Sequence, residues 1–432
     1  MKAGLTVLAA SLLSATAWAN AATHIEKVTA ITQVYGDGEQ LSAVPLTYDK
    51  PLAKESVSAS DYVVSGREIT SVLVSANADV TKSKEGNGRY VVLNLKQLPM
   101  VEQGMEGPKT GANDPHPEEH TGSAMMGQGG PKLGSSGNPQ PLPTFKAEVD
   151  QVGPVSTVAG QVYGPTAKLT STATRELVIE DFQQAVFKDK ADGNKTLKYN
   201  LFVPKNYDPK RQYPLVVFLH DAGTVSPETK ATLVQGRGAI AWASPEWQAE
   251  HPSFVLAPQY DTVIVNDQYE YGPELARTKD LIEELTKTYS IDTKRIYNTG
   301  QSMGAMASTQ MDISYPNFFA GSYIVGAKWD ASRTQPLSKQ NIVALVSEGD
   351  TGAKPSFDTI MGNLEKAGSK VVRATFNPSA NLSEANQQMA KVFTPEAHLY
   401  YFTLAGGTHR SSWQYAYDFK PVMKWLFEQS RQ

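Results

Sequence analysis

Apolar and polar residues alternate in short runs between residues 24 and 98, and turn residues separate the runs. The clearest alternating runs lie at 28–34, 44–48, 69–74 and 90–95, with Gly-Asp-Gly at 36–38 and Gly-Asn-Gly at 86–88 as turns. Alternation with a period of two is typical of strands that bury one face, and closely spaced turns are typical of small sandwiches. The pattern therefore predicts an all-β sandwich near the N-terminus.

Residues 101–143 break this pattern, because they are dense in Gly, Pro, Ser and Asn and show almost no periodicity. Such a composition predicts a flexible, exposed Gly/Pro-rich insertion. Strand-like runs resume at 145–152 and 155–162, so the insertion interrupts the sandwich rather than ending it. We therefore assign residues 22–175 to one β-sandwich domain.

From residue 176 to residue 432, strand-like and helical patterns alternate. Continuous apolar runs at 215–219 and 254–257 are typical of buried parallel strands, and further strand-like runs lie at 295–299, 322–325, 342–346 and 371–376. Leu275, Thr278, Ile282, Leu285 and Tyr289 recur at helical spacing, with Glu283 and Lys287 placed to pair at i,i+4. Pro421 suits the first position of a last helix. The pattern predicts an α/β domain with a mostly parallel, doubly wound sheet.

The first 19 residues are typical of a secretory signal peptide. Lys2 supplies the positive charge, residues 5–13 form a short apolar core, and Ala17-Trp18-Ala19 is a small-x-small cleavage site. Ala19-Asn20-Ala21 is a second candidate for that cleavage site. No apolar run is long enough to span a bilayer. We therefore expect a periplasmic or extracellular protein without a transmembrane helix.

Composition excludes several kinds of chemistry. The net charge is −4, with no long Lys/Arg run, which argues against nucleic acid or an acidic membrane surface as partner. The chain has no cysteine, so it has no disulfide, no thiolate metal site and no cysteine nucleophile. His116 and His120 flank Pro117 within the Gly/Pro-rich insertion, and we interpret them as solvated rather than metal-binding. We expect no metal and no cofactor.

The motif Gly300-Gln301-Ser302-Met303-Gly304 follows one of the predicted strands and precedes a stretch rich in Ala and Met. A serine at a sharp strand-to-helix turn projects its hydroxyl into the open, and flanking glycines let the backbones pass closely. The motif alone is weak in a chain with 33 glycines, so its partners must decide. It makes Ser302 the candidate nucleophile of a serine hydrolase.

A serine nucleophile needs a histidine base and an acid that orients the base, and on this fold they follow the serine in the order acid, then histidine. His24, His116, His120, His220 and His251 precede Ser302, and His398 begins an apolar strand. His409 remains as the candidate base. Asp350, just after the strand-like run 342–346, is the favoured acid, with Glu348 and Asp358 as alternatives.

The tetrahedral intermediate of acyl transfer carries an oxyanion that needs backbone N–H donors. One predicted donor is the N–H of Met303, directly after the nucleophile. The other should come from the loop after the run 215–219, and we choose Ala222, with Asp221 as the next candidate.

Several longer stretches carry a family resemblance: 197–204, 213–220, 256–259, 291–304, 425–427, and His409 with Trp413 four residues later. With these stretches the C-terminal half resembles α/β-hydrolase esterases related to polyhydroxyalkanoate depolymerases and feruloyl esterases, one branch of which has been labelled predicted peptidases. Residues 34–48 and 67–70 resemble the Ig-like domain that precedes the hydrolase in some bacterial esterases. The resemblance covers nearly all of the mature chain except 101–143.

The resemblance implies a nucleophile at Ser302, an acid at Asp350 and a base at His409. The sequence departs from the family at two places. Asp221 follows His220 where the family usually has glycine, and Ser347-Glu348 precedes the acid in place of His-Gly.

These observations predict an exported carboxylic-ester hydrolase that acts through an acyl-enzyme on a small-molecule or polymer-borne ester. Two other functions stay open: a serine peptidase with the same triad, and a non-catalytic Ig-like binding protein with an inactive hydrolase domain. The Ig-like domain is also a candidate surface for homo-oligomer formation. Trp413, Tyr415 and Tyr417 either line a pocket or pack the last helices on the sheet, and the same choice holds for Trp242 and Trp247.

Overall fold

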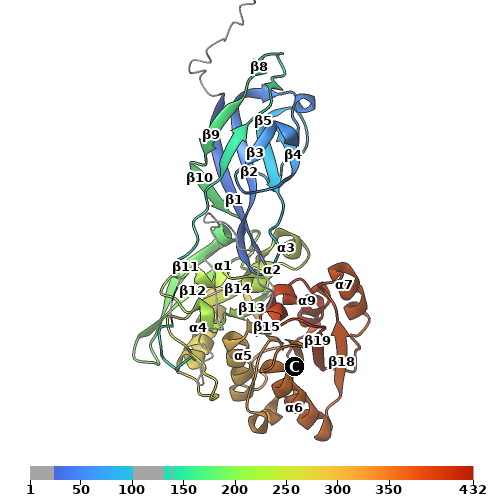
Figure 1. Ribbon diagram of the computed structural model, residues 1–432. Helices are drawn as coiled ribbons and strands as arrows, with labels where there is room; N and C mark the ends of the chain where they lie inside the picture. The colour runs from blue at the N-terminus through green and yellow to red at the C-terminus, as the bar shows by residue number, and fades with distance from the viewer. Residues whose placement is uncertain (1–23, 101–130, 138, 140, 432) are drawn as a thin grey trace, which may run out of the picture. The chain divides into compact units, whose positions relative to one another are not determined.

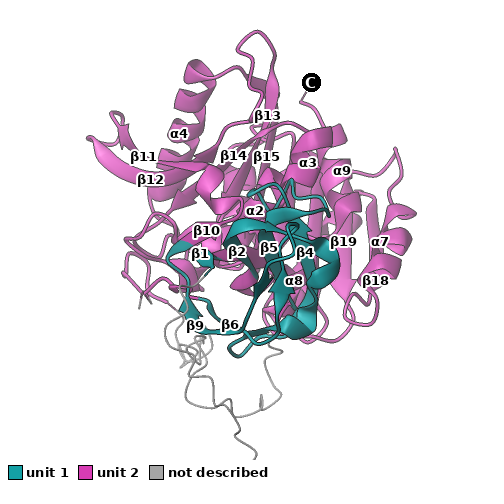
Figure 2. Cartoon of the chain, turned by 90° about the horizontal axis from the view of Figure 1, so that it is seen from above, with its two compact units in different colours: residues 1–29, 43–96, 147–173 teal, residues 30–42, 97–146, 174–432 magenta. Residues whose placement is uncertain are grey.

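A computed structural model describes residues 24–100, 131–137, 139 and 141–431 of the chain (Figure 1). The expected signal peptide at 1–19 and residues 101–130 of the expected insertion lie outside the described residues. The chain forms two compact units (Figure 2). The first contains residues up to 29, 43–96 and 147–173, and the second contains 30–42, 97–146 and everything from 174 onward.

Antiparallel strands build the N-terminal sandwich. One sheet has the order β10-β1-β2-β5-β4, a second has the order β3-β6-β9, and β7 pairs with β8. The strands are β1 (Ile25–Tyr35), β2 (Gly38–Leu52), β3 (Tyr62–Val64), β4 (Ile69–Ser75), β5 (Gly88–Leu95), β6 (Glu148–Gln151), β7 (Val155–Ser156), β8 (Val162–Tyr163), β9 (Thr166–Thr170) and β10 (Ala173–Glu176). The predicted Gly-rich turns connect β1 to β2 and immediately precede β5. The all-β prediction for this region is confirmed.

A buried polar contact joins the two sheets of the sandwich. The hydroxyl of Tyr48, on β2, is fully buried and donates to Gln151 Oε1 on β6 at 2.8 Å. It also lies 2.8 Å from the hydroxyl of Tyr62 on β3. A buried hydroxyl without partners would cost free energy, so these contacts let an aromatic ring fill the core without an orphaned polar atom.

The described part of the Gly/Pro-rich segment is not the free insertion that its composition predicts. The Gly134 N–H donates to the Val263 carbonyl at 2.8 Å, and the Val263 N–H donates to the Ser135 carbonyl at 2.8 Å. Leu142 packs against a hydrophobic core of the second unit. One pair of backbone hydrogen bonds and one apolar side chain leave no periodic signal, which is why the sequence pattern missed this attachment.

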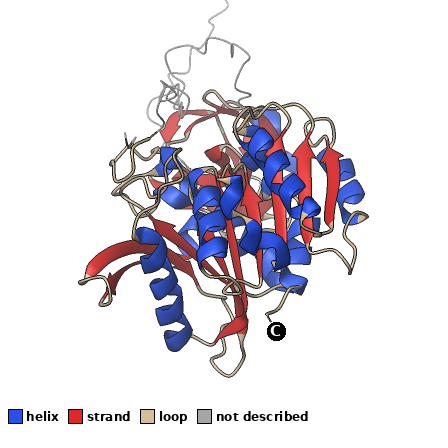
Figure 3. Ribbon diagram, turned by 90° about the horizontal axis from the view of Figure 1, so that it is seen from below, coloured by secondary structure: helices blue, strands red, loops and turns tan. Residues whose placement is uncertain are grey.

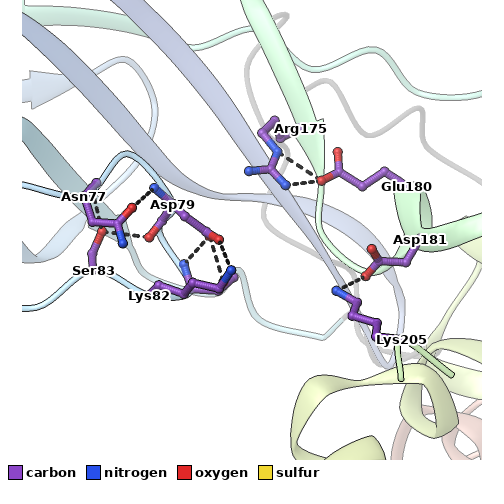
Figure 4. Close-up of polar contacts among 9 residues, drawn as sticks. Asn77, Asp79, Lys82, Ser83, Arg175, Glu180, Asp181 and Lys205 are labelled. Atoms are coloured by element: carbon purple, nitrogen blue, oxygen red, sulfur yellow. Dashed lines mark hydrogen bonds and ion pairs between the residues drawn. The ribbon is translucent and has the colours of Figure 1, made fainter. Parts of the chain in front are cut away.

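Residues of the segment that connects β10 to β11 form ion pairs. This segment contains the short 3₁₀ helix η3 (Ile179–Asp181). Arg175 pairs with Glu180, and Asp181 pairs with Lys205 at 3.0 Å (Figure 4). Within the first unit, Figure 4 also shows Asp79 and Lys82 in the turn between β4 and β5, with N–O 3.4 Å. These pairs are partly exposed, so each contributes only about 0.2–1 kcal/mol to the free energy of unfolding.

The second unit is built on a nine-stranded sheet with the order β11-β12-β14-β13-β15-β16-β17-β19-β18. β11 (Phe182–Asp189) and β12 (Lys195–Phe202) are antiparallel to their neighbours, and the rest of the sheet is parallel. The parallel strands are β13 (Tyr213–Leu219), β14 (Phe254–Gln259), β15 (Ile291–Gln301), β16 (Gly321–Val325), β17 (Ile342–Ser347), β18 (Val371–Phe376) and β19 (Leu399–Leu404). The predicted α/β fold with a mostly parallel sheet is confirmed.

Helices cover both faces of this sheet, so alternate side chains of each central strand enter two different cores (Figure 3). On β13, Leu215, Val217 and Leu219 belong to one core, whereas Val216 and Phe218 belong to the other. The first core includes α4 (Glu274–Thr288), α5 (Met303–Ser314) and α6 (Ala353–Lys366), and the second includes α2 (Arg237–Ala243), α3 (Pro245–Glu250), α7 (Leu382–Ala390) and α9 (Lys420–Glu428). Burial on both faces explains why these strands are continuously apolar.

Two details of the helices bear on the sequence predictions. Pro421 lies in the first turn of α9, as its fixed backbone angle predicts. On α4, however, Glu283 forms its i,i+4 pair with Lys279, and Lys287 pairs with Glu284 instead. The prediction of a pair between Glu283 and Lys287 was wrong, because two lysines and two glutamates compete on this face of the helix. Within the described ranges, none of the helices is long and apolar enough to cross a bilayer.

Four strands of the parallel sheet lead directly to the candidate site residues. β15 ends at Gln301, directly before Ser302, and β13 ends at Leu219, just before the loop that contains Ala222. β17 leads to Asp350 and β19 leads to His409. Since parallel strands present their carboxyl ends at the same edge of a sheet, the fold brings these four loops to one place.

Candidate active site

Ser302 lies at a strained turn between β15 and α5. Its φ angle is 51°, in a region that non-glycine residues rarely adopt. A Cβ on Gly300 would lie 2.5 Å from the backbone of Gly304, and a Cβ on Gly304 would lie 1.9 Å from the carbonyl oxygen of Leu219. A side chain at either position would clash with backbone atoms, so both positions require glycine. The cause is the sharp turn between β15 and α5 and the packing of α5 against the end of β13.

The structure brings Ser302, His409 and Asp350 together, although they are far apart in the sequence. Ser302 Oγ lies 2.9 Å from His409 Nε2, and His409 Nδ1 lies 2.5 Å from Asp350 Oδ2. A carboxylate can only accept, so Nδ1 carries the hydrogen and Nε2 presents its lone pair to the serine hydroxyl. This is the arrangement in which a serine can lose its proton to a histidine.

Asp350 is 4% exposed, and burial by itself disfavours its ionised form. Three donors outweigh that effect: the His409 ring, the Ala353 N–H at 2.8 Å and the Gly352 N–H at 3.0 Å. Burial raises the pKa of Asp350, but these hydrogen bonds and the nearby imidazole hold the pKa below its usual value. The side chain is therefore a carboxylate over the whole neutral range, as orienting the histidine requires.

The two alternative acids are held elsewhere. Glu348 Oε2 accepts from the Gly406 N–H at 2.9 Å. Asp358 lies within α6, where it pairs with Lys354 at 2.8 Å and accepts from the Tyr401 hydroxyl at 2.9 Å. Neither forms a hydrogen bond with His409 in the part of the chain that the structure describes.

The two predicted oxyanion donors are the first residues of two helical segments. Met303 is the first residue of α5, and Ala222 is the first residue of the 3₁₀ helix η4 (Ala222–Thr224). We find no hydrogen bond from either N–H to another group among the described residues. Free N–H groups at the N-terminus of a helix are suited to bind negative charge.

His220 has a structural position that chain order alone did not reveal. Its ring is fully buried behind the loop of Ala222, and burial lowers its pKa. The Tyr260 N–H donates to Nε2 at 3.0 Å, so Nδ1 carries the hydrogen and donates to the Asp221 carbonyl at 2.8 Å. The signal in the sequence was the position of His220, directly after the last apolar residue of β13.

The aromatic residues near the site divide into two groups. The Trp413 ring lies 4.9 Å from the His409 ring, nearly perpendicular to it. Trp242 is fully buried and stacks on Phe427, and Trp247 is also buried, so both pack the second core rather than line a pocket. Tyr417 is buried in the same core.

Comparisons with known proteins agree with this architecture. Residues 27–164 match the model of the esterase Ig-like N-terminal domain. The chain is similar to the crystal structure of a thermostable esterase, with 26% identity, a TM-score of 0.73, and coverage of 94% of this chain and 100% of the other. No curated protein matches the chain.

Two other solved structures are more distant. One is a feruloyl esterase module from Clostridium thermocellum, with 13% identity, a TM-score of 0.39, and coverage of 56% of this chain and 86% of the other. Another is a ferulic acid esterase from the anaerobic fungus Anaeromyces mucronatus, with 14% identity, a TM-score of 0.38, and coverage of 56% and 89%.

The sheet order, the serine turn and the structural match along nearly the whole chain define the fold class: an α/β-hydrolase fold preceded by an Ig-like domain of the kind found in esterases.

Proposed function

We propose that the protein hydrolyses carboxylic esters through an acyl-enzyme formed on Ser302. The observation that supports the proposal is the pair of linked hydrogen bonds from Ser302 to His409 and from His409 to Asp350. The similarity to a thermostable esterase favours esters over other acyl compounds.

In the first half-reaction, Ser302 Oγ attacks the ester carbonyl carbon while His409 Nε2 takes the hydroxyl proton. Negative charge moves to the carbonyl oxygen, where the N–H groups of Met303 and Ala222 bind it. The tetrahedral intermediate then expels the alcohol, which receives the proton from His409. Asp350 keeps the imidazole in the required tautomer and stabilises its cation.

In the second half-reaction, water replaces the alcohol. His409 takes a proton from the water as its oxygen attacks the acyl carbonyl carbon, and the same two N–H groups bind the second oxyanion. Collapse of this intermediate releases the carboxylic acid and returns the proton to Ser302. Apart from the water that is consumed, each group that acts in these steps is a side chain or a backbone N–H of this chain.

The direct test replaces the nucleophile. We expect Ser302→Ala to lower kcat for a short p-nitrophenyl ester by about 10⁴-fold or more, because no other group can form the acyl-enzyme. Ser383→Ala, a change at an exposed serine on α7, is the matched control and should keep wild-type activity. Normal turnover by Ser302→Ala would refute the proposal.

The other two functions are distinguished by substrate and by labelling. An esterase and a peptidase would use the same triad, so only their substrates distinguish them. A panel of short-acyl, long-acyl and feruloyl esters, assayed beside peptide amides, makes this comparison. We expect hydrolysis of esters and much slower cleavage of amides. Failure of a fluorophosphonate to label Ser302 in the wild-type protein would instead favour a non-catalytic binding protein.

We further propose that residues 1–19 direct export and are removed. The proposal is supported by the charged start, the short apolar core and the small residues at Ala17 and Ala19. Amino-terminal sequencing of the protein recovered outside the cytoplasm should find Asn20 as the first residue. An intact N-terminus at Met1 would contradict the proposal.

A further inference from the structure

The loop of Ala222 and the nucleophile turn are connected by polar side chains that the triad does not use. Gln301 Nε2 donates to Asp221 Oδ2 at 2.8 Å and lies 3.2 Å from Gln235 Oε1. The Thr224 hydroxyl donates to Gln235 Oε1 at 2.6 Å and lies 3.3 and 3.4 Å from the two oxygens of Asp221. These four side chains form a closed ring of contacts.

The bond between Asp221 and Gln301 has a particular place in the chain. Asp221 directly precedes Ala222, and Gln301 directly precedes Ser302 and Met303. The bond therefore joins the two segments that carry the two predicted oxyanion donors. Its acceptor is a carboxylate, so the hydrogen bond is charge-assisted and stronger than one between neutral groups.

Burial of Gln301 supports the assignment of its amide orientation. The side chain is 1% exposed, and its Oε1 has no hydrogen-bond partner among the described residues. If the Gln301 amide were turned over, its Oε1 would face the carboxylate of Asp221 and the side-chain oxygen Oε1 of Gln235. Both of these are acceptors and would repel it. The hydrogen bond to Asp221 thus determines the orientation of the Gln301 amide, although it leaves Gln301 Oε1 buried without a partner among the described residues.

The main chain of Asp221 is also held by hydrogen bonds. Its carbonyl oxygen accepts the Nδ1 hydrogen of His220 at 2.8 Å and the Thr224 N–H at 3.2 Å. His220 is itself fixed by the Tyr260 N–H. The carbonyl of Asp221 is bound by the buried His220 ring, and its carboxylate is bound by Gln301. Asp221 therefore has little freedom to move, and the same holds for the N–H of Ala222 that follows it.

We propose that Asp221 and Gln301 are positioning residues, and that their hydrogen bond sets the separation of the Ala222 and Met303 N–H groups for binding the oxyanion. This inference rests on the proposed ester hydrolysis. It also explains why a carboxylate is tolerated next to a site of developing negative charge: the charge of Asp221 is bound by the Gln301 amide. A loop that is free to move would bind the ester ground state equally well but the transition state less well.

The test is a set of single and double variants assayed on one p-nitrophenyl ester. We expect Asp221→Ala and Gln301→Ala each to lower kcat by about 10- to 100-fold, since small displacements of catalytic groups have effects of this size. KM should change by less than about twofold, because the lost interaction acts in the transition state. The double variant should be no slower than the slower single variant, because both changes remove the same bond.

Two conservative variants separate positioning from general structural damage. Asp221→Asn keeps an oxygen that accepts from Gln301, so it should retain most of kcat. Gln301→Glu places two carboxylates against each other and should lower kcat strongly. Combining Gln301→Glu with Asp221→Asn exchanges donor and acceptor, and we expect this pair to recover much of the activity that Gln301→Glu loses.

Gln388→Ala, at an exposed glutamine of α7, is the matched control and should behave as wild type. Additive losses in the Ala double variant, an effect on KM alone, or no recovery in the exchanged pair would overturn the inference. If Asp221→Ala does not fold, the Asn and Glu variants still decide it. Full activity of the variants beside an inactive Ser302→Ala would reject the positioning role but leave the proposed function standing.

Discussion

Asp350 and Asp312 are both almost completely buried in the hydrolase unit, yet their surroundings shift their pKa values in opposite directions. Asp350, in the loop after β17, is 4% exposed, and Asp312, near the end of α5, is 0% exposed. Asp350 accepts from an imidazole and two backbone N–H groups. Asp312 Oδ1 accepts from the Ser322 hydroxyl at 2.9 Å and more weakly from Asn298 at 3.4 Å, and Oδ2 has no partner among the described residues.

The difference appears in the pKa values. Burial raises the pKa of Asp312 to about 7, and the two side-chain hydrogen bonds only partly oppose it. For Asp350, burial acts in the same direction but the donors prevail, so its pKa lies below the usual value. Burial alone therefore does not determine the charge of a carboxyl group. The number and strength of its donors matter as well, and of these two aspartates Asp350 has enough of them to keep its charge.

Of the changes at these two aspartates, the larger effect is expected at Asp350, the charged one. Asp350→Asn should lower kcat by about 10³- to 10⁴-fold, because an amide can donate to Nδ1 and thereby favour the tautomer that cannot accept the serine proton. Steady-state kinetics on a p-nitrophenyl ester measure it. Asp358→Asn, at the rejected alternative acid, is the control and should stay within about threefold of wild type.

The reverse result would break the comparison. If Asp358→Asn lost activity and Asp350→Asn kept it, the acid of the triad would be misassigned. The buried carboxylate of Asp350 would then have only a structural role.

A smaller effect is expected on stability at Asp312. Its pKa is raised in the folded state, so folding favours the protonated form, and the free energy of unfolding should fall as the pH rises from about 4 to about 7. The contribution of this one group is about 4 kcal/mol over that range. Asp312→Asn cannot ionise, so relative to wild type it should gain stability as the pH rises through this window.

Urea unfolding of both proteins between pH 4 and pH 8 measures this difference. Asp261→Asn, at an exposed aspartate, is the control and should follow the pH dependence of wild type. A difference between wild type and Asp312→Asn that does not change with pH would show that Asp312 ionises at the same pH in the folded and the unfolded chain, so that burial does not raise its pKa. The contrast with Asp350 would then have to be abandoned.

Local patterns were sufficient to predict the fold class and to select residues that the structure brings together. The strand before Ser302 and the apolar runs are features of short stretches, and the order of the three residues along the chain can be read without knowing any contact. Asp312 shows what such patterns miss. It follows Met311 in a helix whose first ten residues are all buried, and nothing local distinguishes it from an aspartate on an exposed helix face.

The bond between Asp221 and Gln301 was missed for a similar reason. The two residues are 80 positions apart and meet only because β13 and β15 are neighbours in the sheet. Asp221 was identified as a departure from the family, but its partner could not be found without the strand order. Contacts of this kind depend on tertiary structure, which is why sequence reasoning found the catalytic candidates but not the residues that hold them.

The hairpin between β1 and β2 has a consequence for dividing the protein. Residues 30–42 are sandwich strands by sequence, but they belong to the second compact unit, where Val34 is fully buried in a core with Phe218 and Trp242. A clone that begins after the sandwich would lack this side chain and leave a hole in the remaining core. The hydrolase unit therefore extends into the N-terminal part of the sequence, and a truncated or chimeric version of it would have to keep residues 30–42.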